Sequence, residues 1–392
     1  MFNRLIILII LCFMMMSCAP TSKFPSVSKA EFVKEAKLQH ALYLQSVYAN
    51  QERLNRVGVP LLFANWQLCE GFVHYDLGVN FMTQNDIPKR YQEYMKDAYH
   101  LGQTPTVFDV APGTPGDGIL KPGDIITRVN GREFSKGSRS QKELYDLIQD
   151  TKGQSLRLTL RDKDDNERTE IITPAKACNM PLVIVNDDTV NASADGWWIV
   201  FSTGMLRFAQ NDLELATIVG HEMAHNSRKH VEAYWRDDFQ TSLQLTLSIL
   251  LRVDILGKKW EINHEMFSPL QESEADYVGL YHAARAGYDI TDAPNFWRRS
   301  AADDPYSIDL RKDSSHPSTA IRFLALEKTV KEIKAKQAAG EDLIPEERES
   351  FSYFKDYLFD EGNDDDKNIS AEDKKWVHDD FEWSDLLEMF EY

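Results

Sequence analysis

Short apolar stretches alternate with polar residues in the second quarter of the chain and predict a β-rich domain. The stretches lie at residues 106–110, 125–129, 156–160 and 170–172. Each has the length and the apolar spacing of a strand. Asn130-Gly131 follows the second stretch and is a tight-turn dipeptide. Residues 140–150 instead repeat apolar side chains at helical spacing, so one helix is expected among the strands.

Helical spacing dominates elsewhere in the chain. Residues 26–56 read as a long amphipathic helix, and residues 213–231 form another helical stretch with an apolar face. Residues 243–256 are strongly apolar but too few to span a membrane. They fit either a buried helix or a segment that covers an active site or faces a membrane. The chain is therefore expected to be an α+β multidomain protein.

The N-terminus has the layout of an export signal. Arg4 is followed by an apolar run from Leu5 to Met16, and the composition turns polar after Cys18. This also resembles the bacterial lipoprotein signal, which is cleaved just before a cysteine that becomes lipid-modified, here Cys18. Ala19 resembles the residue that directs such lipoproteins to the outer membrane. An ordinary secretory signal with an incidental cysteine is the alternative.

Composition restricts the partners of the chain. Hydrophobic residues make up 43% and charged residues 27%, as in ordinary globular proteins. The net charge of −18 opposes binding to nucleic acid and to an anionic lipid surface. Membrane attachment would therefore rest on an acyl chain at Cys18. In an oxidising compartment, the remaining Cys69 and Cys178 predict a disulfide, with two unpaired buried thiols as the alternative.

Residues 70–176 resemble a PDZ domain. The resemblance rests on Leu-Lys-Pro-Gly-Asp at residues 120–124 and on Val-Asn-Gly at residues 129–131. PDZ domains bind an extended peptide by adding it to a sheet edge. Leu77-Gly78-Val79 is a candidate for the loop that would bind a terminal carboxylate, although its contacts stay unassigned. A PDZ-shaped spacer without a ligand is the alternative.

An H-E-M-A-H motif begins at His221 and points to metal chemistry. His221 and His225 lie one helical turn apart, so their imidazoles share a face and suit a tetrahedral Zn²⁺. Glu222 can reach a water activated by the metal without binding the metal itself. Further along, Glu272 and Asp276 share a helical face. One can bind the metal while the other hydrogen-bonds a ligand histidine.

The motif and the later E-x-x-x-D pattern resemble the gluzincin metallopeptidase family, which includes HtpX, BepA and the CAAX prenyl protease. The resemblance implies one Zn²⁺ per chain, held by His221, His225 and Glu272. It also implies that Asp276 orients His221. Glu222 would be the general base that later returns the proton to the leaving amine.

Two further segments extend the resemblance. In the H-P-S-T-A-I-R segment, His316 is implied to approach the metal or the oxyanion, and it caps a latent site in some family members. Arg322 is implied to support the substrate or the oxyanion. An edge strand near residues 197–202 is implied to hold the substrate as an added strand, through Trp198, Ile199, Val200 and Phe201.

The remaining histidines have weaker claims. His230 follows the motif as in the family, but helical counting places it off the ligand face, so a structural role is expected. His264 and His282 have no partner at metal-ligand spacing.

The expected architecture is a mainly helical zincin-type peptidase domain with a small sheet, preceded by the PDZ-like domain. The boundaries are 1–17 for the signal, 18–69 for the lipidated N-terminus and helix, 70–176 for the PDZ-like domain, 180–336 for the peptidase domain and 337–392 for an acidic region.

The resemblance implies a lipid-anchored zinc endopeptidase of the bacterial envelope, at the outer membrane and facing the periplasm. Unfolded or extended proteins would be its substrates, in protein quality control. A latent or non-catalytic peptide-binding, chaperone-like lipoprotein is the alternative. An intramembrane protease would need several spans of about 20 apolar residues, and the sequence after residue 17 has none.

Overall fold

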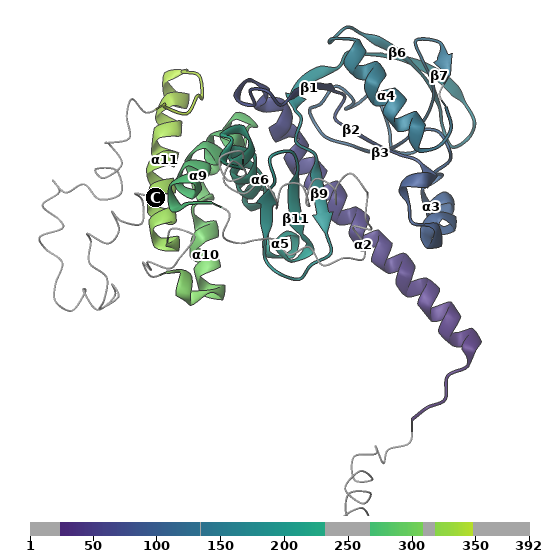
Figure 1. The fold of residues 1–392 in the computed structure, drawn as a ribbon, viewed down its shortest axis with the longest axis horizontal. Coiled ribbons are helices and arrows are strands. Elements are labelled where there is room, and N and C mark those ends of the chain that lie inside the picture. The colour runs from purple at the N-terminus through teal and green to yellow at the C-terminus, as the bar shows by residue number, and fades with distance from the viewer. Residues whose placement is uncertain (1–23, 134, 232–266, 309–317, 348–392) are drawn as a thin grey trace, which may run out of the picture. The chain divides into compact units, whose positions relative to one another are not determined.

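The computed structural model describes residues 24–133, 135–231, 267–308 and 318–347 (Figure 1). The chain divides into two units, residues 1–47 and residues 48–392. Cys18, the apolar segment 243–256, His264, His316 and most of the acidic region lie outside the described residues. Among the described helices, none is both long and apolar enough to cross a membrane.

Helix α2 (Lys29–Ala64) is longer than the sequence predicts. It starts at Ser28, whose backbone N–H and hydroxyl both donate to the Glu31 carboxylate at 2.8 and 2.7 Å. The prediction that it ends at Arg56 is wrong, since the helix continues past Pro60. Burial explains the extension, because its second half contributes apolar side chains to the core of the larger unit. These are Leu54, Val57, Leu61 and Leu62.

The PDZ-like region is built on a six-stranded sheet with the order β2-β3-β4-β6-β7, and β5 pairs with β4. All pairs in it are antiparallel. The strands are β2 (Val79–Met82), β3 (Thr106–Val110), β4 (Ile125–Val129), β5 (Arg132–Glu133), β6 (Leu156–Arg161) and β7 (Glu167–Ile172). Helix α4 (Ser138–Asp150) buries Leu144 and Ile148 in the same core as strand residues such as Leu158.

Strand β2 starts directly after Leu77-Gly78 and lies at one end of the sheet order. The residues between β2 and β3 are largely helical, which accounts for the long separation seen in the sequence. They form η2 (Gln84–Asp86), η3 (Lys89–Tyr91) and α3 (Gln92–Tyr99).

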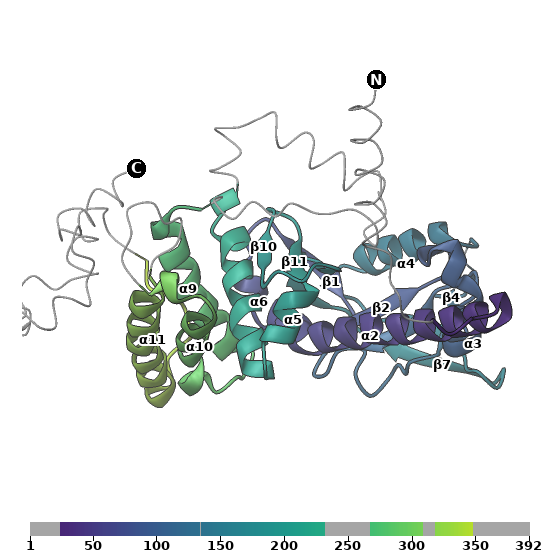
Figure 2. The same ribbon diagram turned by 90° about the horizontal axis from the view of Figure 1, so that it is seen from below.

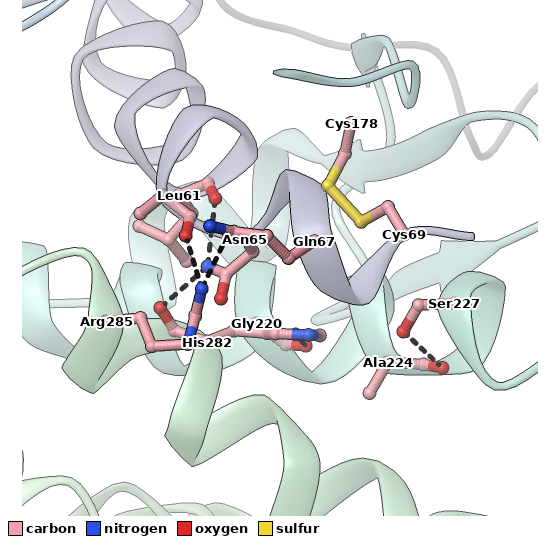
Figure 3. The surroundings of a disulfide bond; sticks show 11 residues. Leu61, Asn65, Gln67, Cys69, Cys178, Gly220, Ala224, Ser227, His282 and Arg285 are labelled. Carbon is pink, nitrogen blue, oxygen red and sulfur yellow. Dashed lines mark hydrogen bonds between the residues drawn. A yellow bond between two sulfur atoms is a disulfide. The ribbon is translucent and has the colours of Figure 1, made fainter. Parts of the chain in front are cut away.

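A disulfide joins the two ends of the PDZ-like region. Cys69 follows η1 (Trp66–Leu68), and Cys178 ends strand β8 (Ala175–Cys178). The structure joins the two sulfur atoms, with their Cα atoms 5.6 Å apart (Figure 3). Strand β1 (Val73–Asp76) pairs antiparallel with β8, so the chain enters and leaves the region side by side.

The peptidase region combines a three-stranded sheet with helices. The sheet order is β10-β11-β9, with β9 (Leu182–Val185) parallel and β10 (Ala192–Ala194) antiparallel to the central β11 (Ile199–Ser202). Helices α9 and α6 pack together, and α11 packs on α9 (Figure 2). The helices are α5 (Thr203–Phe208), α6 (Asp212–Ser227), α9 (Pro269–Arg285), α10 (Asn295–Asp303) and α11 (Thr319–Ala339), with η4 (Ile290–Asp292) and η5 (Pro305–Ser307) between them. The expected α+β multidomain architecture is confirmed.

Helices α6 and α9 touch backbone to backbone. A Cβ atom added to Gly220 would lie 2.3 Å from the carbonyl oxygen of Gly279, and one added to Gly279 would lie 2.6 Å from the amide nitrogen of His221. No side chain fits between the helices at this point. The distance between the two helix axes is therefore set by the two glycines.

We expect Gly279→Ala to force α6 and α9 apart, because the new methyl group meets backbone and not a movable side chain. Overpacking of this kind lowers the free energy of unfolding by about 1–3 kcal/mol. Urea denaturation of the variant measures the loss. Gly102→Ala is the matched control, since nothing lies within 4 Å of a Cβ at Gly102. Equal stability of the two variants would contradict the close-contact account.

His282 joins the same helix pair to the end of α2. Its side chain is fully buried, and its Nδ1 lies 3.0 Å from the carbonyl oxygen of Gly220. The side-chain amide of Asn65 donates to the carbonyl oxygens of His282 and Leu61 at 3.0 and 2.9 Å (Figure 3). Burial lowers the pKa of His282 to about 4. The folded protein therefore holds this imidazole neutral, with Nδ1–H donating to Gly220.

The lowered pKa of His282 predicts a loss of stability in acid. Its ordinary pKa is near 6.5, so between about pH 6.5 and pH 4 the unfolded chain binds a proton that the folded protein does not. Over that window this group should lower the free energy of unfolding by about 3 kcal/mol, with no further loss below it. Denaturation as a function of pH should show a shallower slope for His282→Gln. An unchanged slope in His282→Gln would contradict this account.

Candidate metal centre

Three buried side chains from α6 and α9 converge on one point. The Nε2 atoms of His221 and His225 lie 3.1 Å apart. One Glu272 oxygen lies 3.5 Å from Nε2 of His221, and the other lies 3.5 Å from Nε2 of His225. Two ligands at zinc–nitrogen distances of about 2.0–2.1 Å and tetrahedral angles would be about 3.3 Å apart. The donor set and its spacing therefore fit a zinc ion.

The charges around these side chains also favour a cation. Burial alone would lower the pKa of His221, but the carboxylates of Asp276 and Glu272 outweigh it and raise the pKa to about 10. His225 lacks such a carboxylate hydrogen bond, and burial lowers its pKa well below the ordinary value. The pocket thus attracts positive charge next to Glu272, which a divalent metal ion would supply.

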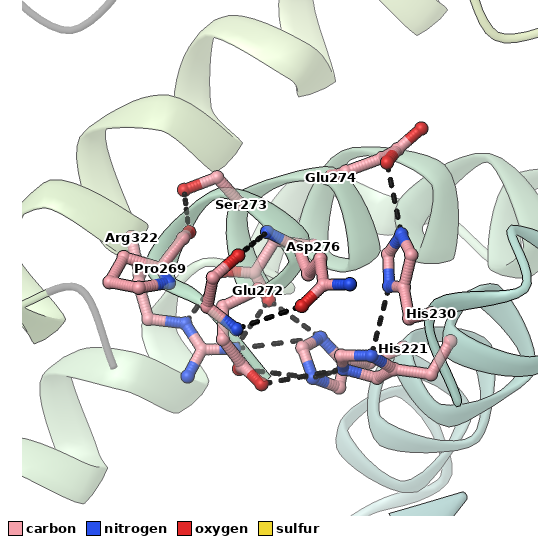
Figure 4. A network of polar contacts seen from close by, with 11 residues as sticks. His221, His230, Pro269, Glu272, Ser273, Glu274, Asp276 and Arg322 are labelled. Carbon is pink, nitrogen blue, oxygen red and sulfur yellow. Dashed lines mark hydrogen bonds and ion pairs between the residues drawn. The ribbon is translucent and has the colours of Figure 1, made fainter. Parts of the chain in front are cut away.

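His221 is held from behind by Asp276 and Arg322. Its Nδ1 lies 2.9 Å from Oδ1 of Asp276, which leaves Nε2 facing the metal position. Nε and Nη2 of Arg322 donate to the two Asp276 oxygens at 2.6 and 2.7 Å (Figure 4). Burial would raise the pKa of Asp276, but the Arg322 guanidinium outweighs it and lowers that pKa. Asp276 thus stays charged and fixes the ring of His221.

Arg322 is buried among the side chains that surround the metal ligands. Its guanidinium is buried, pairs with Asp276, lies 3.5 Å from a Glu272 oxygen and stacks 3.4 Å from the centre of the Trp297 ring. These contacts favour a positioning role for Arg322, and the implied support of substrate or oxyanion stays a prediction.

His225 is held by a second set of side chains, which the sequence analysis missed. Nδ1 of His230 lies 3.0 Å from Nδ1 of His225, and Nε2 of His230 lies 3.0 Å from a Glu274 oxygen (Figure 4). The Phe267 ring stacks on His225 with centroids 3.7 Å apart. If Nε2 of His225 binds the metal, its Nδ1–H donates to His230, and Nε2–H of His230 donates to Glu274.

Helical counting placed His230 away from the ligands because it assumed an unbroken helix. Helix α6 ends at Ser227, and Lys229 then adopts a left-handed backbone with φ of +60°. This turn folds His230 back onto His225. The available signal was a histidine just beyond the helix end, but nothing in the sequence announces the left-handed residue.

Glu222 lies on α6 beside His221 and is buried at the same site. Burial would lower the pKa of Arg322, but Asp276 raises it, with smaller contributions from Glu272 and Glu222. Glu222 is thus buried next to a ligand histidine in the sequence and does not belong to the cluster of three candidate ligands.

The prediction of substrate addition to residues 198–201 is wrong. Strand β11 is central, so its backbone groups pair with β10 on one side and β9 on the other. Ile199, Val200 and Phe201 therefore offer no free edge. Trp198 lies just before β11, where its backbone N–H donates to Oδ1 of Asp195 at 2.6 Å and its carbonyl accepts from Asn226. Among the described residues, β10 pairs with β11 alone.

The turn between β10 and β11 is tied to the metal helix. Oδ1 of Asn226 accepts from the Gly196 backbone N–H at 2.8 Å, and its Nδ2 donates to the Trp198 carbonyl at 3.3 Å. Asn226 directly follows His225 in the sequence. The edge strand β10 is therefore held at a fixed position next to the ligand histidines.

Comparison with known proteins finds a matching family model for each region. Residues 166–330 match the model of Peptidase family M48, and residues 106–162 match that of the PDZ domain. The chain is similar to the Mitochondrial metalloendopeptidase OMA1 of Arabidopsis thaliana, with 31% identity over 140 residues, which are 35% of this chain and 29% of the relative. It is also similar to the OMA1 of Schizosaccharomyces pombe, with 25% identity over 170 residues, 41% of this chain and 49% of the relative.

A bacterial relative aligns over a similar length. The Beta-barrel assembly-enhancing protease of Escherichia coli (strain K12) is 29% identical over 155 residues, which are 35% of this chain and 32% of that protein. The chain therefore spans less than half the length of each of these curated relatives.

We predict that Glu274→Ala weakens zinc binding, because His230 loses the acceptor that fixes its proton on Nε2. Loss of a group that orients a ligand lowers metal affinity by about 10- to 100-fold. Competition with a chelator measures the zinc dissociation constant. Glu347→Ala is the matched control, since Glu347 pairs with Arg228 at 2.7 Å, as Glu274 does at 3.8 Å. Equal affinities of the two variants would count against the His225–His230–Glu274 arrangement.

Proposed function

We propose that this chain, which carries a Peptidase family M48 domain and a PDZ domain, is a zinc-dependent endopeptidase acting on unfolded or extended proteins. The observation that carries the proposal is the buried cluster of His221, His225 and Glu272 with Glu222 beside it. The metalloendopeptidase named among its relatives supports the same chemistry.

His221, His225 and Glu272 would hold the zinc ion, one ion per chain. When bound, zinc supplies Lewis-acid activation of water and of the peptide carbonyl. Asp276 and Arg322 keep the His221 ring in place, and His230 with Glu274 does the same for His225. The ligands are thereby fixed before substrate arrives, which lowers the reorganisation needed during reaction.

Glu222 would perform the proton transfers. Its carboxylate takes a proton from the attacking water and returns it to the nitrogen of the broken peptide bond, which then leaves as an amine. Burial of Glu222 excludes bulk water from the path of this proton. His316 stays a proposal as a further group at the metal or the oxyanion, on the resemblance of its segment alone.

The substrate would lie against β10. Strand addition needs an edge with unpaired backbone groups, and β10 is the edge nearest in sequence to the strand originally expected. Because Asn226 fixes the β10–β11 turn beside His225, an added strand would lie close to the metal position.

The proposed location is the bacterial envelope, with the chain anchored by lipid at Cys18 and facing the periplasm at the outer membrane. The apolar run before Cys18 and the similarity to the Beta-barrel assembly-enhancing protease support this location. Quality control of envelope proteins is the corresponding role. A lipid anchor would also allow a chain with net charge −18 to associate with a membrane.

Digestion of a permanently unfolded protein, such as reduced and carboxymethylated lactalbumin, tests the activity. We expect the zinc-loaded chain starting after Cys18 to cleave it and Glu222→Gln to lower kcat/KM by about 10²- to 10⁴-fold, because the proton acceptor is lost. Glu327→Gln, an exposed change on α11, should cleave like the parent. If the parent binds zinc but cleaves no more than Glu222→Gln, the chain is a latent or peptide-binding protein instead.

A further inference from the structure

The loop at the start of β2 carries a carboxylate where a PDZ domain would hold one from its ligand. Asp76 ends β1, and its Oδ1 accepts from the Gly78 backbone N–H at 2.6 Å. Burial raises the pKa of Asp76, while His74 and hydrogen bonds from the Gly78 and Leu77 amides oppose that rise. The Gly78 amide therefore donates to a carboxylate that belongs to the chain itself.

This loop is rigid. The Leu77 side chain is buried, and its carbonyl accepts from the Gly116 N–H at 2.7 Å. Gly78 has φ of +70°, its carbonyl accepts from the Ala111 N–H at 2.9 Å, and a Cβ there would lie 2.2 Å from Thr114. The backbone of Leu77 and Gly78 is thus held in one orientation. The Gly78 N–H that donates to Asp76 therefore cannot easily turn to another acceptor.

Side chains of helix α4 also form hydrogen bonds with the backbone of β2 and of β1, the strands on either side of this loop. Nε2 of Gln141 donates to the Phe81 carbonyl of β2 at 2.7 Å. Gln149 pairs with both backbone groups of Tyr75 in β1, accepting from its N–H at 3.0 Å and donating to its carbonyl at 2.7 Å. The Phe81 carbonyl therefore points away from β3 and toward α4, on the side where a peptide would join β2.

We propose that the groove between β2 and α4 takes internal segments of extended chains and excludes free C-termini, because Asp76 occupies the place of a terminal carboxylate. A second carboxylate would find the Gly78 amide already bonded and would be repelled by the charge of Asp76. An internal segment carries no such charge and needs only the backbone groups of β2, with Gln141 giving way at Phe81. This inference rests on the proposed function, since it assumes that the PDZ domain receives protein substrates.

Binding of paired peptides tests the proposal. The probes are overlapping peptides of α-casein, each made once with a free C-terminal carboxylate and once as the C-terminal amide. They are titrated by fluorescence anisotropy against the chain starting after Cys18, with Glu222→Gln so that no probe is cut. We expect amides to bind more tightly than the matching carboxylates.

In Asp76→Ala the preference should reverse, with the carboxylate forms gaining about tenfold or more in affinity, as expected for hydrogen bonds to a charged acceptor. Asp76→Asn separates the two causes, since it keeps an acceptor for the Gly78 amide but removes the charge. Asp117→Ala is the matched control, because Asp117 likewise accepts a backbone N–H, that of Gly113 at 2.8 Å, in another loop. Thermal unfolding establishes that each variant is folded.

The proposal would be overturned if the protein with Asp76 intact bound the free-carboxylate peptides more tightly than their amides. It would also be overturned if Asp76→Ala left a preference for the amides unchanged. Absence of binding in every variant would also overturn it, since the groove would then accept no peptide. Cleavage of unfolded protein by the Glu222 parent is measured separately. A failure of the groove can therefore be told from a failure of the proposed peptidase activity.

Discussion

The candidate metal centre depends on the contact between Gly220 and Gly279. His221 directly follows Gly220, while Asp276 and Glu272 precede Gly279 by about one and two helical turns on the same face. Because the two backbones touch, the carboxylates on α9 lie within reach of the imidazoles on α6. The geometry of the donor set is therefore a property of the helix pair, and the side chains around it only refine ring orientation.

The ring orientations of the two ligand histidines are fixed in different ways. His221 is held by a charge pair, Asp276 with Arg322, that is buried throughout. His225 is held by His230, which passes the hydrogen bond on to a Glu274 side chain that is 48% exposed. One arrangement is shielded from solvent and the other reaches it. Changes at the protein surface can therefore influence the metal position through His225 far more readily than through His221.

Local patterns predicted much of this structure, and long-range pairing limited the rest. Helical periodicity alone places His221 and His225 on one face of α6, whereas Glu272 as the third ligand was implied by the resemblance to the gluzincin family. The edge position was misjudged because strand order depends on which strands pair, and a four-residue apolar run such as β11 does not encode its neighbours. Arg322 was assigned from resemblance alone, and its burial against Trp297 is a tertiary fact.

The closeness of the two ends of the PDZ-like region, at Cys69 and Cys178, bears on how such a chain can evolve. The Cα atoms of Cys69 and Cys178 are 5.6 Å apart although 109 positions separate them in the sequence. A folded body whose two ends meet can be inserted into a host chain, or removed from it, with little displacement of the flanking backbone. The PDZ-like region could thus have been inserted into a peptidase chain as one folded unit. The disulfide between Cys69 and Cys178 keeps the two ends of this unit together.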